Sequence, residues 1–176
     1  MFTELAFCIC TPQSKAVTCW KAISSLIKNG LLFKGSAEQI RPFLNVRFGY
    51  KKASYIVEAR KFFTEDGKLK IKKKIQEIKN AFELREWLVE NVKGFGLKEA
   101  SHFLRNIGFE GLAILDRHVL KKLKEYGVIK EIPKSLTKRN YLEIENEMKK
   151  FSKRLKIPIE ELDLLLWSGE TGRIFK

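Results

Sequence analysis

Cysteine is scarce in this chain of 176 residues, and its placement excludes several classes of protein. The three cysteines, Cys8, Cys10 and Cys19, all lie near the start of the chain within an apolar stretch. An odd number of closely spaced cysteines does not predict a disulfide framework and fits a reduced, intracellular protein. No apolar run approaches the roughly eighteen residues of a membrane helix, and no secretory signal is found. We therefore expect a soluble, cytoplasmic protein without a membrane partner.

Histidine is scarcer still, and the two histidines lie far from the cysteines. His102 and His118 do not combine with any cysteine at a spacing typical of zinc ligands. We therefore expect no bound metal of structural or catalytic importance.

The sequence also contains no internal repeat and no low-complexity segment. Its length suffices for one domain or two small lobes that share a core, which excludes a large multidomain enzyme.

Negative charge is in short supply, because 21 Asp and Glu face 35 Lys and Arg and leave a formal net charge of +14. Such an excess favours a polyanionic partner such as nucleic acid. Surplus lysine also keeps proteins soluble, so charge alone does not identify the partner.

Apolar residues recur at helical spacing along most of the chain, and no convincing pair of strands is found. The sequence therefore predicts an all-α fold. A short helix is expected after the capping residue Ser36, and Asp66-Gly67 is expected to form a turn. The remaining helices are predicted over residues 3–10, 12–29, 51–63, 70–78, 82–91, 97–107, 116–126, 137–156 and 158–167.

Two glycines, Gly94 and Gly96, bracket Phe95 between two predicted helices. Glycine permits the positive φ and the close backbone approach of a tight turn. The helix predicted after Gly96 presents unpaired N–H groups, which can bind a phosphate oxygen. Together with Lys93, this hairpin is expected to bind the DNA backbone.

Lys98 and Asp116 supply the chemistry of an amine nucleophile beside a carboxylate. Lys98 falls in the first turn of the helix that follows the hairpin, and Asp116 comes eighteen residues later. A carboxylate near a sugar carbon stabilises positive charge as a base departs, or accepts a proton from the attacking amine. In the alternative interpretation Lys98 only contacts phosphate, as lysines of noncatalytic hairpins do.

The turn, the lysine and the aspartate together resemble the helix-hairpin-helix DNA glycosylases. Within that superfamily the chain looks most like the compact type-2 archaeal and bacterial 8-oxoguanine DNA glycosylase/lyases. The family usually has one more N-terminal helix before residue 9 than is seen here. Four further segments carry the resemblance, namely residues 9–16, 46–53, 55–60 and 166–176.

The resemblance implies a two-lobed fold with a cleft between the lobes, one lobe formed by residues 1–14 with 110–176 and the other by 15–109. It also implies a base-excision repair enzyme that flips 8-oxoguanine out of duplex DNA and excises it. Lys98 would attack C1′ and form a Schiff base, Asp116 would stabilise the charge, and β-elimination would cleave the 3′ side. We expect a monomer that acts on the nucleoid.

The resemblance also suggests residues that touch DNA and the damaged base. Gln13 would reach the orphaned partner base, and Arg47 with Phe48 would plug or buckle the duplex, although Phe48 fits a core position equally well. His118 would donate to a phosphate, or serve a structural role. For the base, Trp167 would stack on it and the terminal Lys176 would reach its pocket. On general grounds Trp167 would pack in the core, and Lys176 would be an ordinary chain end.

No iron–sulfur cluster is expected, because related cluster-containing glycosylases use four closely spaced cysteines near the C-terminus and none follows Cys19. The only ion implied is a monovalent cation at the hairpin carbonyls near Val92. Two alternatives remain open at this point. One is a noncatalytic helix-hairpin-helix DNA-binding module, and the other is a lyase glycosylase for oxidised pyrimidines, whose members commonly carry the cluster cysteines.

Overall fold

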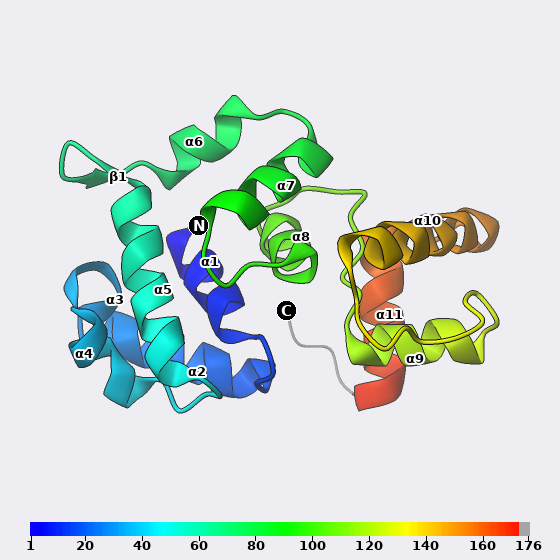
Figure 1. Ribbon diagram of the computed structural model, residues 1–176, viewed down its shortest axis with the longest axis horizontal. Helices are drawn as coiled ribbons and strands as arrows, with labels where there is room; N and C mark the ends of the chain where they lie inside the picture. The colour runs from blue at the N-terminus through cyan, green and yellow to red at the C-terminus, as the bar shows by residue number, and fades with distance from the viewer. Residues whose placement is uncertain (173–176) are drawn as a thin grey trace. The chain divides into compact units, whose positions relative to one another are not determined.

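The computed structural model describes residues 1–172, with side chains at all of them except 170 and 171. The regular secondary structure of the described chain is almost entirely helical, and the chain divides into two compact units, Met1–Phe103 and Leu104–Lys176 (Figure 1). Among residues 1–172, no helix combines the length and the apolar character that crossing a membrane would require. The prediction of an all-α protein is confirmed, apart from one very short hairpin.

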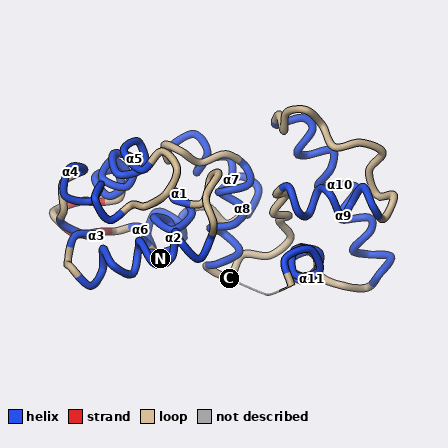
Figure 2. The backbone as a smooth tube through the Cα atoms, turned by 90° about the horizontal axis from the view of Figure 1, so that it is seen from below, coloured by secondary structure: helices blue, strands red, loops and turns tan. Residues whose placement is uncertain are grey.

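The first unit is built around α1, which is apolar except for Thr3 and Glu4. Seven of its nine residues are buried, and both views place it between α5 and α8 (Figures 1 and 2). Phe7 of α1 meets His102 of α8 edge to face, with ring centroids 5.5 Å apart. The helices of this unit are α1 (Phe2–Cys10), α2 (Ala16–Lys28), α3 (Leu31–Lys34), α4 (Ala37–Ile40), α5 (Gly49–Phe62), α6 (Ile71–Glu77), α7 (Ala81–Asn91) and most of α8 (Leu97–Asn106), with a 3-10 turn η1 (Arg41–Phe43).

The sequence missed one pair of strands. Strands β1 (Thr64–Glu65) and β2 (Lys68–Leu69) pair antiparallel around the predicted Asp66-Gly67 turn. Both turn residues have positive φ, 51° and 70°, as the tightest hairpin turns require. Strands of two residues are too short to show the alternation by which strands are recognised in a sequence, so the expectation that no strand pair exists was wrong here.

Helix α2 starts later than predicted. The sequence placed its start at Pro12, whereas the structure begins the helix at Ala16. Gln13 has φ of 54°, which breaks the helical path between α1 and α2. By contrast, the predicted cap at Ser36 is confirmed, because its hydroxyl accepts from Gln39 N and Ser36 N donates to the Gln39 side chain.

The second unit packs α11 (Ile159–Thr171) against α9 (Arg117–Glu125) and α10 (Lys138–Leu155). Asp116 and Thr137 cap α9 and α10 through their side-chain oxygens. The division of the chain differs from the expected lobes, which grouped residues 1–14 with 110–176. In the structure α1 belongs to the first unit, because its apolar surface is buried against α2 and α5.

Candidate active site and nucleic-acid interface

The hairpin between α7 and α8 is held tightly against α5. Gly94 has φ of 86°, and a Cβ built on it would lie 2.7 Å from Cδ2 of Tyr55. Phe95 turns inward, is buried, and lies 6.2 Å from Phe103 between ring centroids. Gly94 therefore serves two needs, since its positive φ makes the turn and its missing side chain lets Tyr55 approach. The turn leaves Lys93 and Gly94 exposed.

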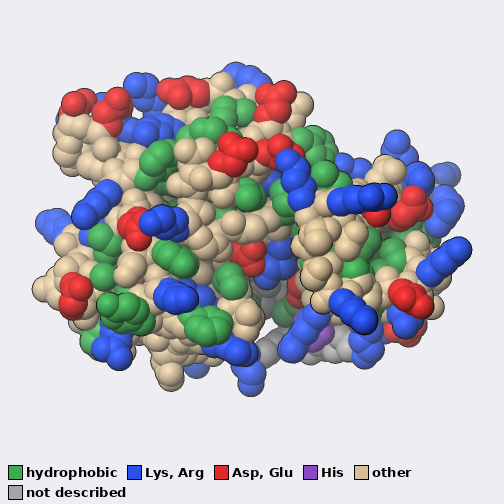
Figure 3. Space-filling view, in the orientation of Figure 1, with side chains coloured by type: hydrophobic (Ala, Val, Ile, Leu, Met, Phe, Trp, Pro, Cys, Tyr) green, Lys and Arg blue, Asp and Glu red, His purple; other side chains and the backbone are tan. Residues whose placement is uncertain are grey.

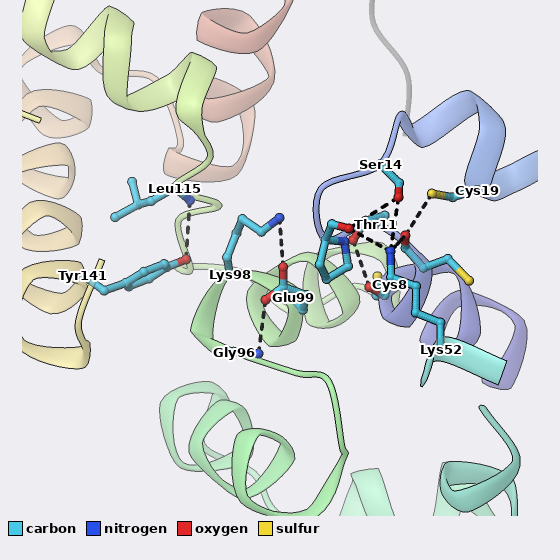
Figure 4. A network of polar contacts seen from close by, with 12 residues as sticks. Cys8, Thr11, Ser14, Cys19, Lys52, Gly96, Lys98, Glu99, Leu115 and Tyr141 are labelled. Carbon is cyan, nitrogen blue, oxygen red and sulfur yellow. Dashed lines mark hydrogen bonds and ion pairs between the residues drawn. The ribbon is translucent and has the colours of Figure 1, made fainter. Parts of the chain in front are cut away.

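Lys98 is the second residue of α8 and is bound to its neighbour Glu99. The Lys98 Nζ lies 2.9 Å from Glu99 Oε1, while Glu99 Oε2 accepts a 3.1 Å hydrogen bond from Gly96 N (Figure 4). Glu99 is buried, whereas the Lys98 side chain keeps 28% of its surface exposed. The carboxylate thus fixes the amine relative to the hairpin while leaving it open to an approaching substrate.

Glu99 is a site residue that was not expected from the sequence. Its role follows from helix capping, because a Glu at the third helical position can accept from the N–H of the cap residue. Gly96 occupies the cap position and has no side chain, so the usual Ser/Thr signature is missing. The Gly-x-x-Glu spacing was the available signal.

Lys93, predicted to bind DNA, pairs with Glu58 of α5 at 2.7 Å. The hydrogen bond and charge of that carboxylate raise the pKa of Lys93. The Lys93 and Glu58 side chains are 68% and 44% exposed, so the ion pair contributes little to stability. The Lys93 ammonium can therefore leave Glu58 and bind a phosphate instead.

Asp116 is the N-cap of α9. Its Oδ1 accepts hydrogen bonds of 2.9 Å from both His118 N and Val119 N. Because both bonds use one oxygen, Oδ2 is left for another partner. Next to it, Arg117 Nε donates to His118 Nε2 at 3.2 Å, and His118 is half-buried. The predicted phosphate contact of His118 remains a prediction.

The extended segment that precedes Asp116 is held by buried polar side chains of α10 and α11. Ala113 N donates to Glu145 at 2.9 Å and Ile114 N donates to Asp163 at 3.2 Å. The Tyr141 hydroxyl donates to Ala113 O at 2.6 Å. Three side chains from two helices therefore fix the backbone immediately before Asp116. Local sequence patterns do not reveal these long-range hydrogen bonds.

Asp163 also forms an ion pair with Arg105, the last basic residue of α8. Burial raises the pKa of Asp163 to about 7, although the Arg105 guanidinium and the Ile114 N–H act in the opposite direction. The negative charge of the Asp116 carboxylate raises the pKa of Asp163 further.

The structure decides the open question about Phe48. Its side chain is 51% exposed, which rules out a core position. The Arg47 guanidinium carbon lies 4.9 Å from the centroid of the Phe48 ring, a typical cation–π geometry. Gln13 is also exposed, on the turn between α1 and α2. All three side chains are accessible, as contact with DNA requires.

Among the residues predicted to read the base, Trp167 is half-buried in α11. Lys176 lies outside the described residues. The roles of both remain predictions.

Within residues 1–172, no group of three His, Cys, Asp or Glu side chains is placed to hold a metal ion. The three cysteines are buried and unbridged. Burial raises the pKa of the Cys10 thiol to about 12 and that of the Cys19 thiol to about 11, so both stay protonated and unreactive at neutral pH. The Val92 carbonyl lies where the resemblance suggested a monovalent cation, and it accepts a 3.1 Å hydrogen bond from Phe95 N. The cation itself remains a prediction.

Lys98 belongs to the first unit and Asp116 to the second. The model of a helix-hairpin-helix family described as 8-oxoguanine DNA glycosylase matches residues 1–157. The matched region includes both Lys98 and Asp116. The chain belongs to the 8-oxoguanine DNA glycosylase family. The membership predicted from the hairpin, the lysine and the aspartate is thereby confirmed.

Curated members of this glycosylase family are similar over about four fifths of their length. The 8-oxoguanine DNA glycosylase/AP lyase of Fusobacterium nucleatum is 51% identical, and the match covers 98% of this chain and 81% of the relative. The protein of that name from Methanocaldococcus jannaschii is 42% identical, with 99% and 82% covered.

Solved glycosylase structures share the fold. The Methanocaldococcus jannaschii 8-oxoguanine glycosylase/lyase, in complex with DNA that contains 8-oxoguanine, matches with a TM-score of 0.90 at 39% identity and covers 99% of this chain and 82% of its own. The 8-oxoguanine DNA glycosylase of Thermotoga maritima gives a TM-score of 0.83 at 39% identity, covering 99% and 81%. The expected helix-hairpin-helix glycosylase fold is confirmed.

Proposed function

We propose that this chain is a bifunctional base-excision repair enzyme that removes 8-oxoguanine from duplex DNA and then cleaves the strand on the 3′ side. The observation that carries the proposal is the partly exposed Lys98 amine, two residues beyond the Gly-Phe-Gly turn, in a member of this family. The relatives named 8-oxoguanine DNA glycosylase/AP lyase support both activities.

The chemistry uses Lys98 as nucleophile and Asp116 as the charge-stabilising acid. Lys98 gives up one proton to solvent, leaves Glu99 and attacks C1′, and the base departs with the electron pair of the broken bond. The Asp116 carboxylate stabilises positive charge on the sugar during this step. The C1′–O4′ bond of the adduct then opens, a proton passes from the amine nitrogen to O4′, and a Schiff base forms. The Schiff base acidifies the C2′ protons, and loss of one of them expels the 3′ phosphate. The mechanism requires both side chains to reach one nucleotide.

The proposed interface combines side chains that insert into the duplex with groups that bind its backbone. Gln13, Arg47 and Phe48 fill the space that the flipped base leaves. Trp167 and Lys176 contact the base itself. The backbone is bound by Lys93, Gly94, Gly96 and His118. We further propose that the enzyme acts as a monomer on the nucleoid, in the cytoplasm, without an iron–sulfur cluster and with at most a monovalent cation at the hairpin.

Borohydride trapping on duplex DNA tests the nucleophile. We expect the wild-type protein to form a covalent complex with an 8-oxoguanine duplex, and Lys98→Gln to form none. Asp116→Asn should lower excision by about 100-fold or more while leaving DNA binding intact. Asparagine caps helices about as well as aspartate, so this variant removes the charge and keeps the cap.

Lys72→Gln, on the exposed side of α6, is the matched lysine control and should trap normally. A fully active Lys98→Gln protein would contradict the assignment. Duplex binding without any adduct from the wild type would favour the noncatalytic DNA-binding module instead. Faster excision of thymine glycol than of 8-oxoguanine would favour the glycosylase for oxidised pyrimidines.

A further inference from the structure

Lys52 is a buried ammonium that the proposed reaction does not use. It lies on α5 with 4% of its surface exposed. Its Nζ donates to Cys10 O at 2.8 Å, to Pro12 O at 2.7 Å and to Ser14 Oγ at 3.2 Å (Figure 4). An ammonium has three hydrogens to donate, and here all three go to the single turn between α1 and α2. Burial of an unpaired ammonium is costly, and it lowers the pKa of Lys52.

Ser14 connects this turn to a second loop that is distant in sequence. Its hydroxyl oxygen accepts from Arg47 N at 3.1 Å as well as from Lys52 Nζ. The same hydroxyl donates to Pro12 O at 3.4 Å. A hydroxyl offers one donor and two acceptor positions, so its capacity is fully used. Ser14 therefore ties the turn that carries Gln13 to the loop that carries Phe48.

Both loops contain a strained residue whose side chain points to solvent. Gln13 has φ of 54° and Phe48 has φ of 58°. In residues 1–172 only two other non-glycine residues have positive φ, Asp66 and Lys156. These close the β-hairpin and end α10, where left-handed backbone is ordinary. Gln13 and Phe48 lie in neither a hairpin turn nor a helix C-terminus, and such strain persists only where the surroundings impose it.

We propose that Lys52 and Ser14 are positioning residues that hold the Gln13 turn and the Arg47–Phe48 loop together as one rigid insertion surface for duplex DNA. The proposal rests on the proposed function, because it assigns these loops to the filling of the duplex after a base is flipped. Neither Lys52 nor Ser14 touches the substrate.

A shared anchor has a clear physical advantage for base flipping. Two independent loops would each lose conformational freedom as they enter the duplex, which weakens binding. Loops that are already joined lose less, and insertion of one side chain brings the other into place. Gln13 and Phe48 should then contribute cooperatively to excision of a stacked base. They should matter less for an abasic site, which has no base to extrude.

The primary variant is Ser14→Ala, which removes the shared acceptor of Arg47 N and leaves Lys52 two of its three acceptors. Single-turnover excision from an 8-oxoguanine duplex should fall about fivefold, the effect expected when the hydrogen bond from Arg47 N no longer holds the second loop. Incision of a pre-formed abasic duplex should change less than about twofold. Ser14→Thr, which keeps the hydroxyl, should restore excision, and Ser24→Ala, at an exposed site of α2, is the matched control.

A double-mutant cycle provides the readout that a merely structural role would not move. In the wild-type background, Gln13→Ala and Phe48→Ala should be non-additive in excision rate by about fivefold, as for coupled residues. In the Ser14→Ala background the same two changes should become additive. A 2-aminopurine placed beside the lesion should show slower unstacking for Ser14→Ala than for the wild type.

Two results would overturn the proposal. One is equal loss of excision and abasic incision in Ser14→Ala, which indicates general damage to the fold or the nucleophile. The other is a coupling between Gln13 and Phe48 that survives without the Ser14 hydroxyl. Both are separable from a failure of the proposed function, since wild-type protein that traps no 8-oxoguanine duplex would refute the activity itself.

Discussion

Gly94 is the residue of the hairpin at which any side chain meets an obstacle. Its φ of 86° is unfavourable for every other residue type, and a Cβ would lie only 2.7 Å from Tyr55 Cδ2. Tyr55 belongs to α5, as does Glu58, which pairs with Lys93. A single missing methyl group therefore allows the turn beside Lys98 to rest directly on a neighbouring helix.

Gly94→Ala is expected to destabilise the protein by about 3 kcal/mol, because backbone strain and a steric clash act together. Gly67→Ala separates the two causes, since Gly67 has φ of 70° and open space around its Cβ position. It should cost only about 1 kcal/mol, the strain alone. Urea denaturation of both variants measures the difference. Equal losses at the two glycines would show that the contact with Tyr55 is unimportant.

At the scale of elements, the segment before α9 depends on two other helices for its hydrogen bonds. Glu145 and Tyr141 come from α10, and Asp163 comes from α11. Backbone N–H groups that are buried without a partner are costly, so these side chains are required wherever the segment is extended and covered. The position of Asp116 is therefore a property of the α9–α11 packing.

Asp163 should make the stability of the protein depend on pH. Burial raises its pKa from 3.8 to about 7, so between these values the folded state binds more protons than the unfolded state. The free energy of unfolding contributed by Asp163 should therefore fall as pH rises from about 4 to about 7, by up to about 4 kcal/mol, and stay level above that. Asp163→Asn has no proton to lose and should lack this decline.

Urea denaturation across that pH range, with wild type and variant compared at each pH, measures the effect. Glu143→Gln, an exposed acid of α10 paired with Arg139, is the control and should follow the wild type. Parallel pH curves for the wild type and Asp163→Asn would contradict the assignment of the raised pKa.

At the scale of the whole molecule, the net charge of +14 is the dominant electrostatic feature. On the face shown in Figure 3, Lys and Arg side chains are spread widely, with Asp and Glu among them. A spread of positive charge attracts a polyanion without reading its sequence. In the proposed function, the hairpin and the inserted side chains then position the protein on the DNA.

Binding to undamaged duplex DNA should weaken steeply as salt rises, because each neutralised phosphate releases counterions. Lys93→Gln should reduce the slope of log K against log salt by about one, the contribution of one phosphate contact. Lys72→Gln should leave the slope near that of the wild type. Fluorescence anisotropy at several salt concentrations measures both. A Lys93→Gln slope equal to that of the wild type would remove Lys93 from the interface.

The predictions that the structure confirmed depend on residues close together in the chain. Ser36 predicted the start of a helix, and Gly94 with Gly96 predicted the turn before Lys98. Both predictions succeeded because helix capping and a positive φ depend on residues only a few positions apart. Glu99 was missed although its signal was equally local, since glycine at the cap hides the usual pattern. Phe48 could not be assigned to core or surface, because an aromatic side chain in a loop suits either.

The sequence by itself determined the helices, the positive charge, the hairpin and the family, since these follow from neighbouring residues and from motifs that survive without knowledge of packing. Only the tertiary structure showed that Lys52 fastens the Gln13 turn to α5, that Ser14 joins it to Arg47, and that Asp163 holds the segment before Asp116. These hydrogen bonds join residues separated by 33 to 49 positions. A buried polar group takes whichever partner the packing brings within 3 Å or so, and no local pattern specifies that partner.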